Sequence, residues 1–188
     1  MGWFTMQAGG STNPQRFFNQ YGLMSKPYTR NTITWASGYG AKYKRVLKLP
    51  DADVMDFPAV LRGGLPNLIH LNTTLAPVLG ALELHAQKDL GLRDRAGLDF
   101  AGAGDPTQMD CVDEAWNATA SCLWLQSHGA LRGWSVHEPL SRWSFSKWNH
   151  YGALLVNDAD PKLRAIIDGG VRAGGLPPLI IEERKWYV

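Results

Sequence analysis

The sequence predicts an α+β protein in which helices pack against an antiparallel β-meander. Two observations carry this prediction. Apolar residues recur at helical spacing over two segments in the middle of the chain, whereas the last third consists of short runs rich in strand-forming residues. Turn-forming Asp, Pro and Gly residues separate those runs, which is typical of consecutive antiparallel strands. The order of elements, helices first and strands afterwards, favours an α+β layer fold.

The composition is that of a globular protein without a nucleic-acid footprint. The 188 residues are 45% hydrophobic and 19% charged, enough to bury a core. The net charge is +2 and the basic residues are scattered, so we expect no nucleic-acid partner. We divide the chain at residue 70: an irregular arm with one short strand over 1–70, and a core domain over 71–188.

Residues 1–40 show little periodicity and are rich in Gly, Ser, Asn and Thr. We expect an irregular arm that docks on the body or on a protein partner through aromatic side chains: Trp3, Phe4, Phe17, Phe18 and Tyr21. A strand is predicted over 43–49, and its basic residues are interpreted as a solvated face.

Two helices are predicted next. The first covers roughly 74–90, where apolar residues repeat every three or four positions. The second covers about 106–128, with Asp105 as its N-cap, Pro106 in the first helical position and Gly129 at its end. Small residues from Cys111 to Cys122 form one stripe on this second helix. We therefore expect it to be central and packed against a sheet.

Four strands complete the prediction, with turns between them. They cover 133–138, 150–156, 164–170 and 178–183, the last as an edge strand.

Cys111 and Cys122 are expected to be free thiols. Eleven residues along one helix separate them by about 16 Å, too far for a disulfide. Free thiols, with no signal peptide or transmembrane run in sight, favour the cytoplasm or another reducing compartment.

Cys111 is the candidate nucleophile, because the first turn of a helix favours a thiolate. The neighbouring carboxylates act in the opposite direction, since they disfavour a second negative charge. A reactive thiolate therefore needs a cation from elsewhere, and histidine is the obvious source. The other interpretation is a structural cysteine.

His150 is the best-placed of the five histidines. It opens an apolar strand, and the next strand ends at Asp168, so antiparallel pairing can set the carboxylate beside the imidazole. Cys111, His150 and Asp168 then form a nucleophile, base and orienter. A metal site made from Cys111 and histidines (His128, His137 and His150) is the weaker alternative, because no pair has ligand spacing. We expect no metal and no cofactor.

Four segments together resemble the transglutaminase-like cysteine-peptidase superfamily, and more closely a group of bacterial transglutaminase-like proteins. They are "DCVDEAWNAT" at 110–119, "HGALRGWSV" at 128–136, "WNHYGALLV" at 148–156 and "IIDGGVRAGGLPPLI" at 166–180. The resemblance covers roughly residues 70–188 and implies a transglutaminase/papain-like core.

The resemblance implies a cysteine-dependent amide hydrolase or acyltransferase with a peptide or amide substrate. Cys111 would be the nucleophile, His150 the general base and Asp168 its orienter, with the Cys111 N–H in the oxyanion site. Aromatic residues near His150 are expected to line the substrate cleft: Trp143, Trp148 and Tyr151.

This chain departs from the family pattern at two places. Asp168 is followed by Gly169 and Gly170, where the family has a small residue and then an aromatic one; His150 is followed by Tyr151, where the family has a small polar residue. These departures keep an alternative open, in which the domain is catalytically degenerate and serves as a binding or accessory subunit of a larger assembly.

Overall fold

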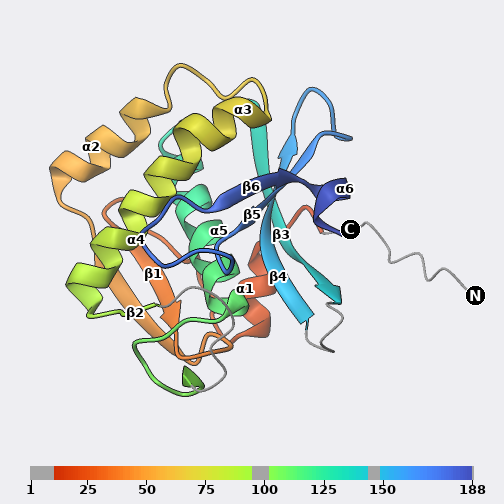
Figure 1. Ribbon diagram of the computed structural model, residues 1–188. Coiled ribbons are helices and arrows are strands. Elements are labelled where there is room, and N and C mark those ends of the chain that lie inside the picture. The colour runs from red at the N-terminus through yellow and green to blue at the C-terminus, as the bar shows by residue number, and fades with distance from the viewer. Residues whose placement is uncertain (1–10, 95–101, 144–148, 188) are drawn as a thin grey trace, which may run out of the picture.

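The computed structural model describes residues 11–94, 102–143 and 149–187. A central helix, α5 (Cys111–Ser127), lies between a two-stranded hairpin and a four-stranded sheet (Figure 1). The hairpin consists of β1 (Thr32–Ser37) and β2 (Tyr43–Lys48). The sheet consists of β3 (Trp134–Trp143), β4 (Asn149–Asn157), β5 (Arg164–Asp168) and β6 (Leu179–Glu182). Each strand of the sheet pairs antiparallel with the next, so the predicted α+β arrangement with a meander is confirmed.

The predicted central position of the second helix is also confirmed, since α5 contacts β1 on one side and β4 on the other. Its polar side chains hold the hairpin. Asn117 accepts the Ala36 N–H at 2.7 Å and donates to the Ala36 carbonyl at 3.1 Å, as a neighbouring strand would. Trp116 donates its indole N–H to the Thr34 carbonyl at 2.8 Å.

The predicted start of this helix is wrong. Asp105 caps only a tight turn, in which its Oδ1 accepts from the N–H and hydroxyl of Thr107. The helix begins at Cys111 with Asp110 as N-cap, and Asp113 completes a capping box. The box outcompetes the Asp-Pro signal because both of its carboxylates also have partners in the hairpin. The end is as predicted, with Gly129 in the left-handed region at φ +71°.

The predicted first helix forms but starts earlier. α3 (Leu68–His70), a π-helical segment (Leu71–Leu75) and α4 (Ala76–Leu90) follow one another without a break. Asn67 caps the start, because its side chain accepts the His70 N–H at 3.1 Å. The π-helical segment shifts the periodicity and hides the first turns from a search at 3.6-residue spacing.

The strands match the predicted positions, with one change in length. β3 was expected over 133–138 and extends to Trp143, past a register shift between His137 and Leu140. Pro139 lies in this irregularity, where a missing backbone N–H is tolerated.

The expectation of an irregular arm over 1–40 is wrong for residues 11–40. They contain α1 (Gln15–Gln20) and β1, and aromatic residues of both elements (Phe17, Phe18 and Trp35) lie in the same hydrophobic core as α5. β1 escapes the search because its polar and apolar residues alternate over only four positions, Thr32 to Trp35, within a segment rich in Gly, Ser and Asn. Trp3 and Phe4 lie outside the described residues.

Two further helices lie where no helix was predicted, α2 (Asp51–Val60) and α6 (Glu183–Trp186). In the part of the chain that the structure describes, no helix has both the length and the apolar character needed to cross a bilayer.

Candidate functional site

Two of the three carboxylates around Cys111 bind the backbone of the β1–β2 hairpin. Asp113 accepts the N–H of Tyr39 at 2.8 Å and of Ala41 at 2.7 Å, and Asp110 accepts the N–H of Gly40 at 3.0 Å. Burial and the charge of Asp110 raise the pKa of Asp113 to about 8, although the three backbone N–H groups that it accepts act in the opposite direction. These acidic neighbours of the cysteine therefore anchor the hairpin to the helix.

The Cys111 thiol is buried and protonated. Cys111 is 7% exposed, and its Sγ donates to the Asn149 carbonyl at 3.5 Å. Burial raises the pKa of the thiol to about 12; the Tyr151 backbone N–H lowers it, whereas Asp110, Glu114 and Asp168 raise it further. The resting cysteine is therefore no thiolate, and the helix N-terminus does not overcome burial.

His150 and Asp168 are brought together by the sheet. The imidazole Nε2 lies 2.8 Å from Oδ2 of Asp168, and the indole N–H of Trp186 donates to the same oxygen at 2.8 Å. The Trp186 ring also lies against the imidazole, with centroids 5.8 Å apart. This carboxylate fixes the orientation of the ring and leaves Nδ1 as its other hydrogen-bonding atom.

The thiol and the imidazole lie on opposite sides of β4. Side chains alternate along this strand: Tyr151 packs against the core shared with α5, whereas Leu154 belongs to the cluster around Trp186. His150 has the parity of Leu154, and Sγ of Cys111 contacts the backbone on either side of His150. Within the described residues, no hydrogen bond joins Cys111 to His150. The structure thus pairs two members of the predicted triad and sets the third against the backbone of the same strand.

The first backbone N–H of α5 is available to a ligand. The next three N–H groups bind Asp110: those of Val112 and Asp113 its side chain, and that of Glu114 its carbonyl. The Cys111 N–H has no acceptor among the described residues. It is a donor beside the thiol, in the place that an oxyanion site requires.

Glu114 is a half-buried residue that the search for a triad missed as a functional group. Its Oε2 is buried and has no hydrogen-bond partner in the described part of the chain. Burial raises its pKa well above the usual range, and Asp94, Glu83, Asp168 and Asp110 raise it further. A Cβ on Gly170 would lie 2.6 Å from this oxygen and 3.3 Å from Cε1 of His150. The carboxyl and the imidazole therefore both lie next to this glycine. The sequence feature that could have pointed to Glu114 was the pair of glycines after Asp168, which leaves room for its side chain.

The expected substrate-binding residues are only partly visible. Tyr151 packs its ring against Phe17, with centroids 6.0 Å apart, and lies against Tyr21. It therefore fills the side of β4 that faces α5. Trp148 and the side chain of Trp143 lie outside the described residues.

The remaining candidates have structural roles. Cys122 is fully buried, and burial raises its pKa to about 12. His128 binds the Trp124 carbonyl at 2.9 Å through Nδ1 near the end of α5. No cluster of three or more His, Cys, Asp or Glu side chains in the described ranges could hold a metal ion.

Comparison with protein-family models, with curated proteins and with solved structures gives no match. The functional interpretation therefore depends on the geometry of these residues.

Proposed function

We propose that this protein performs acyl chemistry on amide bonds, with Cys111 as nucleophile, His150 as general base and Asp168 as its orienter. The observation that carries the proposal is the hydrogen-bonded His150–Asp168 pair at the start of the strand against which the Cys111 thiol is held. The free N–H of Cys111, beside the thiol, supports it.

The reaction begins with a neutral thiol. Sγ exchanges its bond to the Asn149 carbonyl for one to Nδ1 of His150. Because the two side chains start on opposite sides of β4, the first residues of this strand turn as the exchange occurs. His150 takes the thiol proton as Sγ attacks the amide carbon, and the oxyanion accepts the Cys111 N–H. His150 then gives this proton to the leaving nitrogen, and the C–N bond breaks to leave a thioester. Water or an amine attacks the thioester and passes a proton through His150 to Sγ, which restores the thiol.

A second candidate is a catalytically degenerate domain that binds a partner in a larger assembly. The observation in its favour is the buried thiol itself, with its raised pKa of about 12 and its bond to a backbone carbonyl. This alternative predicts that Cys111 reacts no faster than Cys122, whose burial and pKa are similar.

The test uses p-nitrophenyl acetate as acyl donor and the full chain. We expect a burst of nitrophenolate and one acetyl group on Cys111 by mass spectrometry, absent in Cys111→Ala and present in the matched control Cys122→Ala. His150→Ala should slow acylation by about 10²- to 10⁴-fold, the usual contribution of a general base.

A contrary result is equally clear. If His150→Ala acylates at the wild-type rate, and the rate climbs with pH toward the thiol's pKa of about 12, the reaction is that of an unassisted thiol. The binding-subunit alternative then replaces the proposal.

A further inference from the structure

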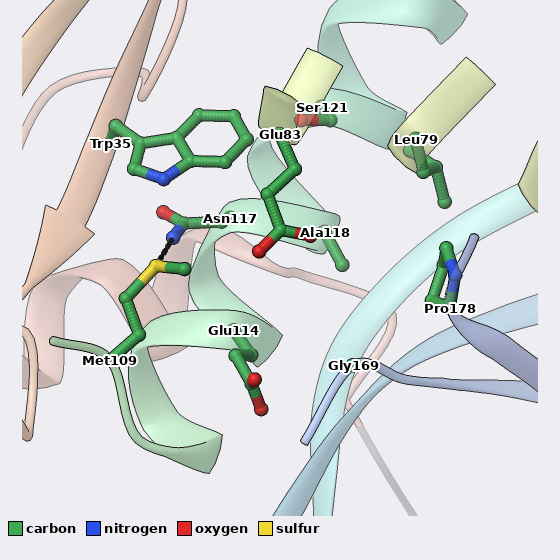
Figure 2. A pocket seen from close by; sticks show the side chains of 10 residues that line it. All are labelled: Trp35, Leu79, Glu83, Met109, Glu114, Asn117, Ala118, Ser121, Gly169 and Pro178. Atoms are coloured by element: carbon green, nitrogen blue, oxygen red, sulfur yellow. Dashed lines mark hydrogen bonds between the residues drawn. The ribbon is translucent and has the colours of Figure 1, made fainter. Parts of the chain in front are cut away.

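A cavity beside the His150–Asp168 pair contains two carboxyl groups from different helices. It lies between α4, α5 and the segment after β5, and its volume is about 30 Å³. Figure 2 shows the Glu83 carboxyl among Trp35, Asn117 and Ala118, and the Glu114 carboxyl on the side of Gly169. The remaining lining residues are Leu79, Met109, Ser121 and Pro178.

Two buried polar atoms of this cavity have no hydrogen-bond partner in the described part of the chain. None of its described lining residues is Lys, Arg or His, so no cation faces the two carboxyls from the wall. Oε2 of Glu114 and the indole N–H of Trp35 are buried without partners. Buried polar atoms in native proteins almost always have a partner, and a pair left without one indicates a ligand or water.

Glu114 connects this cavity to the reaction centre. Its Oε2 and Cε1 of His150 would both contact a Cβ on Gly170, as described above. A Cβ on Gly169 would meet the Cβ of Glu114 at 3.3 Å. The two glycines, which depart from the family pattern, therefore leave room for the Glu114 carboxyl beside the imidazole.

We propose that the cavity between Glu83 and Glu114 binds a primary ammonium group of the substrate. This inference rests on the proposed acyl chemistry for its role and names the substrate class: an amide with a lysine-like side chain, or a free alkylamine that accepts the acyl group. The ammonium supplies three N–H donors: to Oε2 of Glu114, which has no partner among the described residues, and to the Glu83 carboxyl, which also accepts the backbone N–H of Gly175.

The size of the cavity favours ammonium over guanidinium. A space of about 30 Å³ accepts one or two water-sized groups, and an ammonium is that compact, whereas a guanidinium is a wider planar fork. The charges agree. Among the described residues, the charged groups that raise the pKa of these two carboxyls are acidic: Asp94 from the loop after α4 acts on both, and Glu83, Asp168 from β5 and Asp110 from the start of α5 act on Glu114.

A cation that enters this site must displace protons. Burial raises the pKa of Glu83 to about 7 and that of Glu114 well above its usual range. Ammonium binding should therefore strengthen as the pH rises from 6 to 8 and should release protons.

Calorimetry of butylamine with the full chain at pH 8 tests binding directly. We expect saturable binding of butylammonium, no binding of 1-butanol, and at least tenfold weaker binding in Glu114→Gln and in Glu83→Gln. Glu138→Gln, a partly exposed site on β3 with the same charge change, should bind as the wild type does. Thermal unfolding identifies any variant that fails to fold. One folded variant, of Glu114 or of Glu83, is enough to test the subsite. Equal binding of butylammonium and 1-butanol, or unchanged binding in a folded variant, overturns the subsite.

Two acyl donors then separate the two sources of the amine. A side-chain ammonium predicts that the p-nitrophenyl ester of Nα-acetyl-lysine is used at least tenfold better, in kcat/KM, than its norleucine counterpart, and that Glu114→Gln abolishes this ratio. An acceptor amine predicts equal use of both esters and formation of the butylamide, lost in Glu114→Gln.

The two proposals fail in different ways. Butylammonium binding in a protein that neither ester acylates supports the subsite and contradicts the acyl chemistry. Acylation with no ratio between the esters and no butylamide supports the acyl chemistry and contradicts the subsite.

Discussion

The first turn of α5 presents two opposite faces, and they differ in how their acidic groups are satisfied. Toward the β1–β2 hairpin, Asp110 and Asp113 accept backbone N–H groups from the loop over 39–41. Toward β4 and β5, within the described ranges, Glu114 has a buried oxygen without a partner, and the thiol of Cys111 donates to a backbone carbonyl. Carboxylates that look alike in the sequence therefore have different roles: the first two fix the position of the helix, and the third is free for a ligand.

This difference between the two faces explains why the chain tolerates an acidic environment around a cysteine. On the hairpin face the negative charges are compensated by N–H dipoles, which stabilise the structure. On the strand face burial raises the pKa of both Cys111 and Glu114, and the neighbouring carboxylates raise it further. The following predictions test this division, beginning with the largest effect.

Asp113→Ala should cause the largest loss of stability. It removes the acceptor of the buried N–H groups of Tyr39 and Ala41 and half of the capping box, so the free energy of unfolding should fall by about 3 kcal/mol or more. Urea denaturation measures this fall. Asp160→Ala is the matched control, because its exposed carboxylate accepts only the Lys162 N–H and should lose about 1 kcal/mol or less. Equal losses would show that the hairpin face is not specially anchored.

Glu83→Gln should change how stability depends on pH. The folded protein binds a proton at Glu83 more tightly than the unfolded chain, with a pKa of about 7 against 4.5. The protonated carboxyl therefore stabilises the fold below pH 4.5, and this contribution is lost as the pH rises to about 7, by about 1–3 kcal/mol in total. In the glutamine variant, the free energy of unfolding measured by urea denaturation should lack this part of its fall between pH 4.5 and 7. If the variant keeps the wild-type dependence of unfolding free energy on pH, that dependence comes from other titratable groups.

Gly170→Ala and Gly169→Ala should have the smallest effects and should differ from each other. The Gly170 methyl would lie 2.6 Å from Oε2 of Glu114 and must displace the end of that side chain, whereas the Gly169 methyl would lie 3.3 Å from its nearest contact. We expect Gly170→Ala to lower the lysine-to-norleucine preference about tenfold, with a loss of about 1 kcal/mol in stability. Gly169→Ala should largely keep the preference. Identical behaviour of the two variants in the ester assay would show that Glu114 is not part of the subsite.

Much of the fold could be predicted because its signals are local. The stripe of small residues predicted a central helix against a sheet, and turn chemistry predicted four consecutive strands. β1 was not predicted, since its alternation of polar and apolar residues covers only Thr32 to Trp35 and the surrounding residues favour turns. The true N-cap was hidden for a similar reason: Asp105 and Asp110 are both good caps, and only the N–H groups of the distant hairpin favour the second.

The candidate site divides in the same way. Strand order and spacing indicated that His150 and Asp168 would be neighbours, because antiparallel pairing follows from short connections. The place of the thiol relative to the imidazole depends on the face to which each side chain of β4 points, and that is set by packing against α5 and Trp186.

By itself, then, the sequence determined the elements, their order and the residue types available for chemistry, because periodicity, capping and turn preferences are properties of neighbouring residues. Only the tertiary structure decided which charges are compensated. Partners 70 or more positions away bind Asp110 and Asp113, while no described partner reaches Oε2 of Glu114. Desolvation and charge–charge interactions act through space, so the pKa values of Cys111, Glu83 and Glu114 are fixed by packing and not by sequence neighbours.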